Sequence, residues 1–186
     1  MTTTPRAAPT PSDEMATGVN WSQWTLILLK PDCLARNLVR PVLAMAAQHV
    51  RITTERIVYP TAEQVFTHYA DILPLSAELG VDVAAELRRI YLGHPIAVAL
   101  GHGPDAVGRL RAVLGSTDPA EAGPDTIRGR FGTDTLRKAR AEGRLIDNLI
   151  HSSDHAGVVA RDLAVWFGPG VTALLTPSLD PGGSPQ

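Results

Sequence analysis

His151 is the side chain whose position best suits chemistry in this sequence of 186 residues. It follows residues 144–150, an apolar-rich segment that predicts a buried strand, and precedes the polar Ser152-Ser153-Asp154. These three residues predict a helix start that a Ser or Asp side chain caps. An imidazole at that junction, beside free backbone donors, suits work on an anionic substrate. On this segment alone a surface or capping histidine is the commoner explanation, because short motifs match by chance.

Further cationic and polar side chains fall where predicted strands and helices end or within the loop between them: Lys30, Arg111, Thr117, Arg128 and Asn148. Folding of the sheet would bring these positions together around His151. Arginine offers forked donors to phosphate oxygens and lysine offers a compact charge, so the set suits phosphate binding. Taken singly, each cation is an ordinary surface or strand-end charge. Only their joint placement favours a site.

The elements that must position these side chains are four strands. Residues 24–29 are apolar on both faces, which predicts a central strand. Proline at position 31 ends this strand, so Lys30 lies at its edge. The other strands are predicted over residues 52–59, 96–100 and 144–150.

Helices are predicted between the strands, over residues 34–50, 61–72, 82–91, 104–114, 133–142 and 155–167. Thr61 and Gln64 have the spacing of a capping box. Residues 115–132 contain two prolines and four glycines and predict a long loop, of a kind that is usually functional. The order of elements predicts an α/β (α+β) fold: a ferredoxin-like sandwich, with an antiparallel four-stranded sheet and helices on one face. A helical hairpin and the long loop before the last strand are additions to it.

Composition narrows the class of protein. The length suits one domain, predicted over residues 21–169, between a disordered N-terminal tail (1–20) and a flexible C-terminal tail (170–186). The net charge of −2 makes nucleic acid an unlikely partner. Cys33 is the single cysteine, so an internal disulfide and a thiolate zinc site are excluded. No segment is apolar enough to span a membrane and the N-terminus lacks a secretion signal, so we expect a cytoplasmic protein without a membrane partner.

Seven motifs occur in order along nearly the whole domain: Lys30-Pro31-Asp32, Thr67-His68-Tyr69, Gly93-His94-Pro95-Ile96, and the segments 115–119, 123–129, 148–154 and 163–167. Each motif is weak alone, but the combination is specific. Together they resemble the nucleoside diphosphate kinase family. The resemblance implies the ferredoxin-like sandwich with the hairpin and the loop as its characteristic additions. It also implies a homo-oligomer, a tetramer or a hexamer built from a common dimer.

The resemblance implies a phosphotransferase that works through a phosphohistidine at His151. The enzyme would move the γ-phosphate of a nucleoside triphosphate to a nucleoside diphosphate with ping-pong kinetics. By resemblance, Lys30, Arg111, Thr117 and Arg128 hold phosphate oxygens, Lys30 and Asn148 also reach the sugar hydroxyls, and Tyr69 lies beside the histidine. Mg²⁺ would arrive with the nucleotide, because the motifs supply no protein ligands for it.

Asp162 matches a family glutamate that orients the histidine from the last helix. A carboxylate bonded to one ring nitrogen fixes the tautomer and leaves the other nitrogen free to attack. Asp162 is one methylene shorter, so a closer helix, a bridging water or a lost contact are all open. Ser153 matches a family serine near the histidine, and a helix cap is its alternative role.

Other departures from the family concern base recognition more than phosphate transfer. Ser152 stands where glycine is common, and Arg130 stands where an acid is common. The hairpin is longer around residues 75–83 and offers no clear match for the aromatic residue on which the base usually stacks. The segment 131–144 is also extended. His68 is interpreted as a structural residue.

Three functional hypotheses follow. The first is an active nucleoside diphosphate kinase. The second is a diverged phosphohistidine phosphotransferase with a specialised acceptor, which the altered hairpin motivates. The third is a non-catalytic nucleotide-binding or regulatory module, which the short Asp162 and the missing base platform motivate. A decayed site would not be expected to keep every phosphate ligand, which counts against the third.

Overall fold

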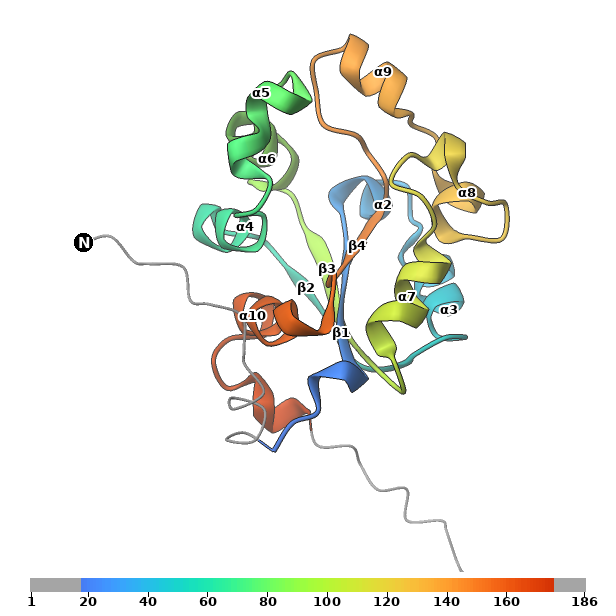
Figure 1. Ribbon diagram of the computed structural model, residues 1–186, viewed down its shortest axis with the longest axis vertical. Helices are drawn as coiled ribbons and strands as arrows, with labels where there is room; N and C mark the ends of the chain where they lie inside the picture. The colour runs from blue at the N-terminus through green and yellow to red at the C-terminus, as the bar shows by residue number, and fades with distance from the viewer. Residues whose placement is uncertain (1–17, 176–186) are drawn as a thin grey trace, which may run out of the picture.

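The computed structural model describes residues 18–175 and is built around a four-stranded antiparallel sheet (Figure 1). The strands are β1 (Trp24–Leu29), β2 (Arg51–Val58), β3 (Ile96–His102) and β4 (Ile150–Ser152), in the spatial order β2-β3-β1-β4. This is the ferredoxin-like arrangement that the sequence predicts. The parts of the predicted tails at residues 1–17 and 176–186 lie outside the described residues.

The helices connect the strands in the predicted order, with several short additions. They are η1 (Trp21–Gln23), α2 (Pro31–Ala35), α3 (Val39–Ala46), α4 (Ala62–His68), η2 (Leu73–Leu75), α5 (Ser76–Leu79), α6 (Val83–Tyr91), α7 (Ala106–Leu114), η3 (Pro119–Glu121), α8 (Ile127–Phe131), α9 (Leu136–Ala141), α10 (Ala156–Phe167) and η4 (Val171–Leu174). The predicted capping box opens α4, where Thr61 and Gln64 each accept a hydrogen bond from the other's backbone N–H. Within residues 18–175, no helix is long and apolar enough to cross a membrane.

Helices cover both faces of the sheet, so the prediction of helices on one face is wrong. Successive side chains of a strand point to opposite faces. In β1, Leu26 and Leu28 pack with residues of α4, α6 and α10, whereas Ile27 and Leu29 pack with residues of α3 and α7. Figure 1 shows these two groups of helices on either side of the sheet. A strand that is apolar on both faces requires cover on both.

Two predicted segments are subdivided. The helix predicted over residues 34–50 is two helices, α2 and α3, separated by a turn in which Asn37 has a φ of 56°. The loop predicted over residues 115–132 contains η3 and α8. Thr126 caps α8 by accepting a hydrogen bond from the N–H of Gly129, so part of the loop is a rigid helical turn.

The last strand starts later than predicted. Leu149 has a φ of 69°, a left-handed conformation that cannot continue an extended strand. Asp32 holds it there, because its Oδ2 accepts a hydrogen bond of 3.0 Å from the N–H of Leu149. β4 therefore begins at Ile150, and His151 pairs with Leu28 within the sheet. His151 thus lies inside the strand, and the prediction that it follows the strand is wrong.

The folded part extends beyond residue 169, where the sequence places the domain end. Val171 and Leu175 are buried in the same apolar cluster as Trp21 and Trp166. Val19 packs against this cluster from the N-terminal side. Residues 18–20 and 170–175 therefore belong to the folded domain, and Val171 and Leu175 are part of its core.

Candidate active site

A cavity of about 540 Å³ opens at the end of the sheet where β1 ends. One wall comes from the hairpin of α4 to α6, and the other comes from α7, α8, α9 and the segment before β4. The predicted site residues that line it are Lys30, Tyr69, Arg111, Thr117, Arg128, Asn148, His151 and Asp162. Among the described residues, Ser153 is the one member of the predicted set that does not line it.

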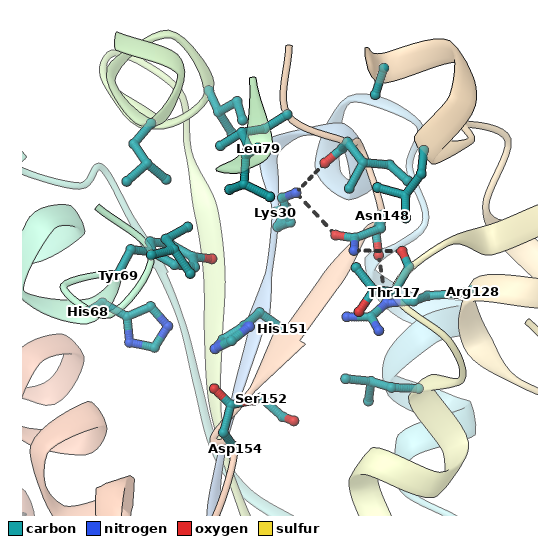
Figure 2. A pocket seen from close by; sticks show the side chains of 18 of the residues that line it. Lys30, His68, Tyr69, Leu79, Thr117, Arg128, Asn148, His151, Ser152 and Asp154 are labelled. Atoms are coloured by element: carbon teal, nitrogen blue, oxygen red, sulfur yellow. Dashed lines mark hydrogen bonds between the residues drawn. The ribbon is translucent and has the colours of Figure 1, made fainter. Parts of the chain in front are cut away.

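His151 projects from β4 into this cavity (Figure 2). The ring of Tyr69 lies with its centroid 5.4 Å from that of His151, and the ring of His68 lies at 4.8 Å. Burial holds the pKa of His151 well below its ordinary value, and the nearby His68, Arg128 and Lys30 act in the same direction against Asp162. The imidazole is therefore neutral at neutral pH, which is the form that can act as a nucleophile.

Lys30 and Asn148 tie the walls of the cavity together (Figure 2). The buried Lys30 Nζ donates to the carbonyl oxygen of Ile146 at 2.9 Å and to Asn148 Oδ1 at 3.1 Å. Asn148 Nδ2 in turn donates to the carbonyl oxygen of Thr117 at 3.0 Å. Burial lowers the pKa of Lys30, while Asp32 raises it. These bonds fix the amine and the amide beside the segment that contains Thr117.

Arg128 is built into the site through its backbone contacts. Its guanidinium donates to the carbonyl oxygens of Asn148 (3.3 Å), Gly115 (3.0 Å) and Ile150 (2.8 Å). A guanidinium has about five N–H donors, so some remain for a ligand. Burial, with help from Arg111, lowers the pKa of Arg128 to about 10. The side chain is still charged at neutral pH.

Arg111 differs from Arg128 because its side chain is about half exposed. It forms an ion pair with the equally exposed Asp154 at the cavity mouth. Such a pair is solvent-screened and exchanges easily for an anionic ligand.

Asp162 does not contact His151, so the direct orienting contact that the family match implies is absent. Its Oδ1 lies 3.4 Å from Nδ1 of His68, and both side chains are about 1% exposed. Arg161 also donates to Oδ1, at 3.0 and 3.2 Å. Because its side chain is one methylene shorter than that of glutamate, the carboxylate of Asp162 contacts His68, which lies between Asp162 and His151. His68, interpreted from sequence as structural, is therefore part of the site.

Ser153 does not cap the last helix. The N-cap of α10 is His155, and it makes no side-chain capping hydrogen bond. Ser153 is buried, and its Oγ accepts a long hydrogen bond of 3.4 Å from the N–H of Leu26. The alternative role as a helix cap is thus wrong, and Ser153 instead joins β1 to the segment after β4.

The distal part of the cavity is lined by aliphatic side chains. Leu79, Val81 and Leu87 contribute from the hairpin, and Leu136 and Leu145 contribute from the opposite wall. Below them the hydroxyls of Tyr69 and Tyr91 are 2.5 Å apart. Leu79 and Val81 belong to the part of the hairpin in which the resemblance offers no clear match for a base-stacking aromatic residue.

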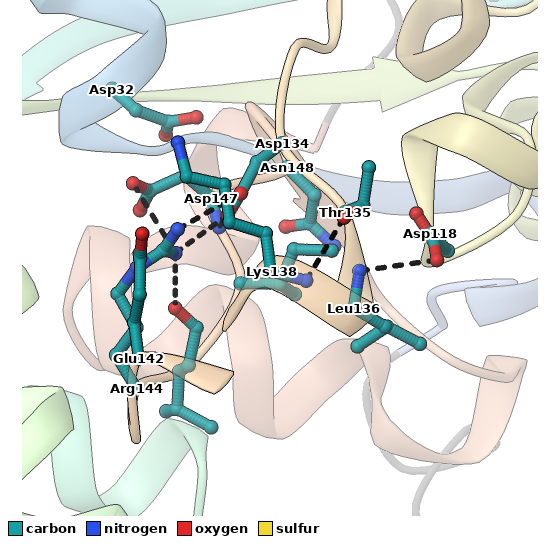
Figure 3. Close-up of polar contacts among 12 residues, drawn as sticks. Asp32, Asp118, Asp134, Thr135, Leu136, Lys138, Glu142, Arg144, Asp147 and Asn148 are labelled. Carbon is teal, nitrogen blue, oxygen red and sulfur yellow. Dashed lines mark hydrogen bonds and ion pairs between the residues drawn. The ribbon is translucent and has the colours of Figure 1, made fainter. Parts of the chain in front are cut away.

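The extended segment 131–144 is fastened by a polar cluster (Figure 3). Arg144 makes two hydrogen bonds to Asp134, at 2.6 and 2.9 Å, and one of 2.7 Å to Glu142. Asp134 also accepts from the N–H of Asp147 at 3.0 Å. Asp118 accepts from the N–H of Leu136 at 3.1 Å and so holds the start of α9. The segment therefore forms a fixed wall of the cavity.

Residues 23–171 match the family model described as "Nucleoside diphosphate kinase". The chain belongs to the nucleoside diphosphate kinase family. A relative of that name from Pyrobaculum aerophilum is 32% identical over 171 residues, covering 77% of this chain and 93% of the relative. One from Streptococcus pneumoniae is 32% identical over 146 residues, covering 77% of this chain and 98% of the relative.

Solved structures of nucleoside diphosphate kinases share the fold. A transition-state mimic of the enzyme from Borrelia burgdorferi with bound vanadate and ADP has a TM-score of 0.71 at 26% identity, covering 78% of this chain and 86% of that one. The enzyme from Pyrobaculum aerophilum has a TM-score of 0.64 at 28% identity, covering 78% and 95%.

Proposed function

We propose that this member of the nucleoside diphosphate kinase family is an active enzyme and that His151 carries the phosphate between substrates. The observation that supports this most is the convergence of Lys30, Arg111, Arg128 and Asn148 on one cavity around a neutral imidazole. These residues come from segments far apart in the chain. A module without catalytic function has no need of that arrangement.

In the proposed first half-reaction, a ring nitrogen of His151 attacks the γ-phosphorus of a nucleoside triphosphate. A nitrogen–phosphorus bond forms and the bond from the γ-phosphorus to its bridging oxygen breaks. The nucleoside diphosphate leaves with the electron pair. A second nucleoside diphosphate then reverses these steps, which gives ping-pong kinetics. Because phosphoryl transfer depends mainly on placement and charge, the cations around His151 supply most of the catalysis.

The site residues take distinct roles in this proposal. Arg128 and Arg111 face the phosphate oxygens, one as a fixed donor and the other released from Asp154 when nucleotide binds. The segment of Thr117 supplies a hydroxyl to the phosphates. Lys30 and Asn148 reach both phosphate and sugar from the same hydrogen-bonded pair. Tyr69, whose hydroxyl is hydrogen-bonded to that of Tyr91, lies beside His151. Ser153 and Asp162 support the position of His151 from the interior of the protein.

Mg²⁺ enters this proposal as part of the nucleotide substrate. Across residues 18–175, no group of three or more His, Cys, Asp or Glu side chains is arranged to hold a metal ion. The cavity around His151 is lined by cations, which suit the phosphates that carry the ion rather than the ion itself. Mg²⁺ characteristically binds through substrate phosphates in such sites and neutralises part of their charge.

A homo-oligomer, tetramer or hexamer, and a cytoplasmic location complete the proposal. β2 lies at one edge of the sheet, and the exposed fractions of Ile57 and Tyr59 along it and just after it are 56% and 67%. Edge strands with large apolar side chains favour pairing with another chain. A lone, buried Cys33 suits a reducing compartment.

Incubation with γ-labelled ATP and Mg²⁺ tests the proposed function. We expect the protein to become labelled at a site that acid hydrolyses and base does not, as for a phosphohistidine. His151→Ala should remove the label. Wild-type protein that stays unlabelled, or a variant that keeps the label, would exclude His151 as the phosphate carrier.

A further inference from the structure

Behind His151, two buried side chains extend the site into the core. His68, at the end of α4, lies on the opposite side of His151 from Arg128 (Figure 2). The two imidazole rings are perpendicular, with an interplanar angle of 89° and centroids 4.8 Å apart. Behind His68, Asp162 of α10 lies 3.4 Å from its Nδ1. The order Asp162, His68, His151 thus runs from the core to the cavity.

The ring nitrogens of the buried His68 are poorly satisfied in this arrangement. Within residues 18–175, Nδ1 has only the long contact of 3.4 Å with Asp162, and Nε2 has no hydrogen-bond partner. A buried polar atom without a partner costs about 1–3 kcal/mol, and such atoms in native proteins call for an explanation. A purely structural role for His68 offers none, because an apolar side chain would fill the same volume without that cost.

We propose that His68 is a positioning residue that connects Asp162 to His151 in this proposed kinase. The carboxylate of Asp162 binds the N–H at Nδ1 of His68, which leaves Nε2 of that ring as an acceptor. Nε2 then accepts a hydrogen bond from the N–H of His151 on the ring nitrogen that does not carry the phosphate. His68 thereby replaces the direct contact that the short Asp162 cannot make.

This arrangement matters most during phosphoryl transfer. When one nitrogen of His151 bonds to phosphorus, the ring becomes positively charged and its N–H becomes a stronger donor. His68 accepts that hydrogen bond, and the negative charge of Asp162 stabilises the pair. No proton needs to leave His151, so the step balances without a further acceptor. In general, a carboxylate behind a catalytic imidazole orients the ring and stabilises the positive charge that it gains.

Several charged or titratable groups surround the two rings. Tyr69 follows α4, Asp162 and Arg161 come from α10, Arg128 comes from α8, and Lys30 follows β1. After the larger effect of burial, the positive charges of Arg128 and Lys30 lower the pKa of His151, and Asp162 raises it. In the proposed arrangement, a neutral His68 accepts a hydrogen bond from the protonated ring of His151 and so favours its protonation. Loss of that bond should therefore lower the pKa of His151, and the acid limb of its pH–rate profile should move to lower pH.

The test is a double-mutant cycle on the single-turnover rate of labelling by γ-labelled ATP. His68→Gln and Asp162→Asn should each slow labelling about 10- to 100-fold, as for other partners that orient a reacting group. The double variant should be about as slow as the slower single variant, because both changes break one connection. His68→Gln should also shift the acid limb of the pH–rate profile of labelling in the direction given above. Effects that multiply in the double variant would mean separate roles and would overturn the inference.

Two further variants make the test specific. His102→Gln is the matched control, because His102 also contacts an aromatic ring, that of Trp24, and has a buried Nε2 without a partner, at the other end of the sheet. It should label at the wild-type rate. Asp162→Glu in the His68→Gln background should recover part of the rate, because a longer carboxylate can reach His151 itself.

Failure of this inference is distinguishable from failure of the proposed function. Wild type that labels normally, with a His68→Gln variant of unchanged rate and pH profile, overturns the role of His68 alone. Wild type that does not label overturns both. If His68→Gln does not fold, judged by its thermal transition, Asp162→Asn and Asp162→Glu carry the test, because both change the carboxylate that lies against Nδ1 of His68. A wild-type rate in Asp162→Asn overturns the inference.

Discussion

At the scale of single residues, the two arginines of the cavity differ in how the protein positions them. The guanidinium of Arg128 donates three hydrogen bonds to the backbone carbonyls of Asn148, Gly115 and Ile150. Arg128 therefore fixes these segments and also places a positive charge in the site. Arg111 is half exposed and paired only with Asp154 among the described residues. The first is part of the fold, and the second is an exposed charge that is available to a ligand.

Replacement of each arginine by alanine should separate these roles. Arg111→Ala should slow phosphoryl transfer by about 10²–10³, or roughly 2.7–4 kcal/mol, as for other preorganised donors. Its stability should stay within about 0.5 kcal/mol of wild type, because the side chain is exposed. Arg128→Ala should slow transfer and also destabilise the protein by about 2–4 kcal/mol, because it leaves buried carbonyls without donors.

Single-turnover labelling and thermal unfolding of the same samples measure both quantities. A normal transfer rate in Arg111→Ala would remove that residue from phosphate binding. Unchanged stability in Arg128→Ala would contradict its role in the fold.

The sequence predicts eight of the residues that line this cavity, because their joint spacing resembles that of the family. It does not predict that Asp162 meets His68. That contact depends on how far α10 stands from β4, and a difference of one methylene decides which ring the carboxylate reaches. The signal available in the sequence was the Thr67-His68-Tyr69 motif itself, which places His68 beside a predicted site residue.

At the scale of elements, the strand before His151 is the most informative departure. The apolar run from Leu145 to Ile150 predicts a strand, but only Ile150 to Ser152 form one. The left-handed Leu149 and its hydrogen bond to Asp32 are long-range features, and a local pattern does not contain them. This break turns Asn148 towards Lys30 and places His151 within the sheet.

The polar cluster that fastens the segment 131–144 should affect nucleotide binding more than the rate of phosphoryl transfer. Asp134→Ala removes the partner of Arg144 and an acceptor for the N–H of Asp147. We expect destabilisation of about 1.5–3 kcal/mol, as for hydrogen bonds to charged groups, and a higher KM for nucleotide with little change in kcat. Arg137→Ala, an exposed position on the same helix, is the matched control.

The stabilisation by Asp134 should depend on pH in a defined direction. Hydrogen bonds from Arg144 hold the pKa of Asp134 well below its ordinary value of 3.8, in spite of burial. The stabilisation is therefore complete above that value and is lost as the pH falls below it. Thermal unfolding of wild type and Asp134→Asn should show a difference at pH 7 that shrinks below about pH 4. A difference that grows in acid would contradict this assignment.

At the scale of the whole molecule, the order of elements is sufficient to predict the ferredoxin-like sheet but not the cover on both faces. β1 contains that information, since Leu26 and Leu28 on one face and Ile27 and Leu29 on the other are all apolar. The prediction of helices on one face follows from the order of elements alone. Residues 170–175 are predicted as part of the C-terminal tail, yet Val171 and Leu175 are buried in the core.

We also predict that the protein forms a homo-oligomer. Sedimentation at micromolar concentration should give a mass several times that of the 19.8 kDa chain. Ile57→Lys and Tyr59→Lys should each shift the protein towards smaller species, because a charge on an edge strand opposes pairing. Leu174→Lys is the control, since Leu174 is 41% exposed on η4. A monomeric wild type would contradict the proposal.

In the proposed reaction, one neutral imidazole within a cluster of cations exchanges a phosphoryl group between nucleotides. The most direct measurement isolates the labelled protein, removes free nucleotide, and adds GDP or another nucleoside diphosphate with Mg²⁺. Label should leave His151 and appear as the matching triphosphate in equal amount. Transfer that is uniformly poor from a well-labelled protein would favour a specialised acceptor. Label that is absent, or that is present without His151, would contradict the account.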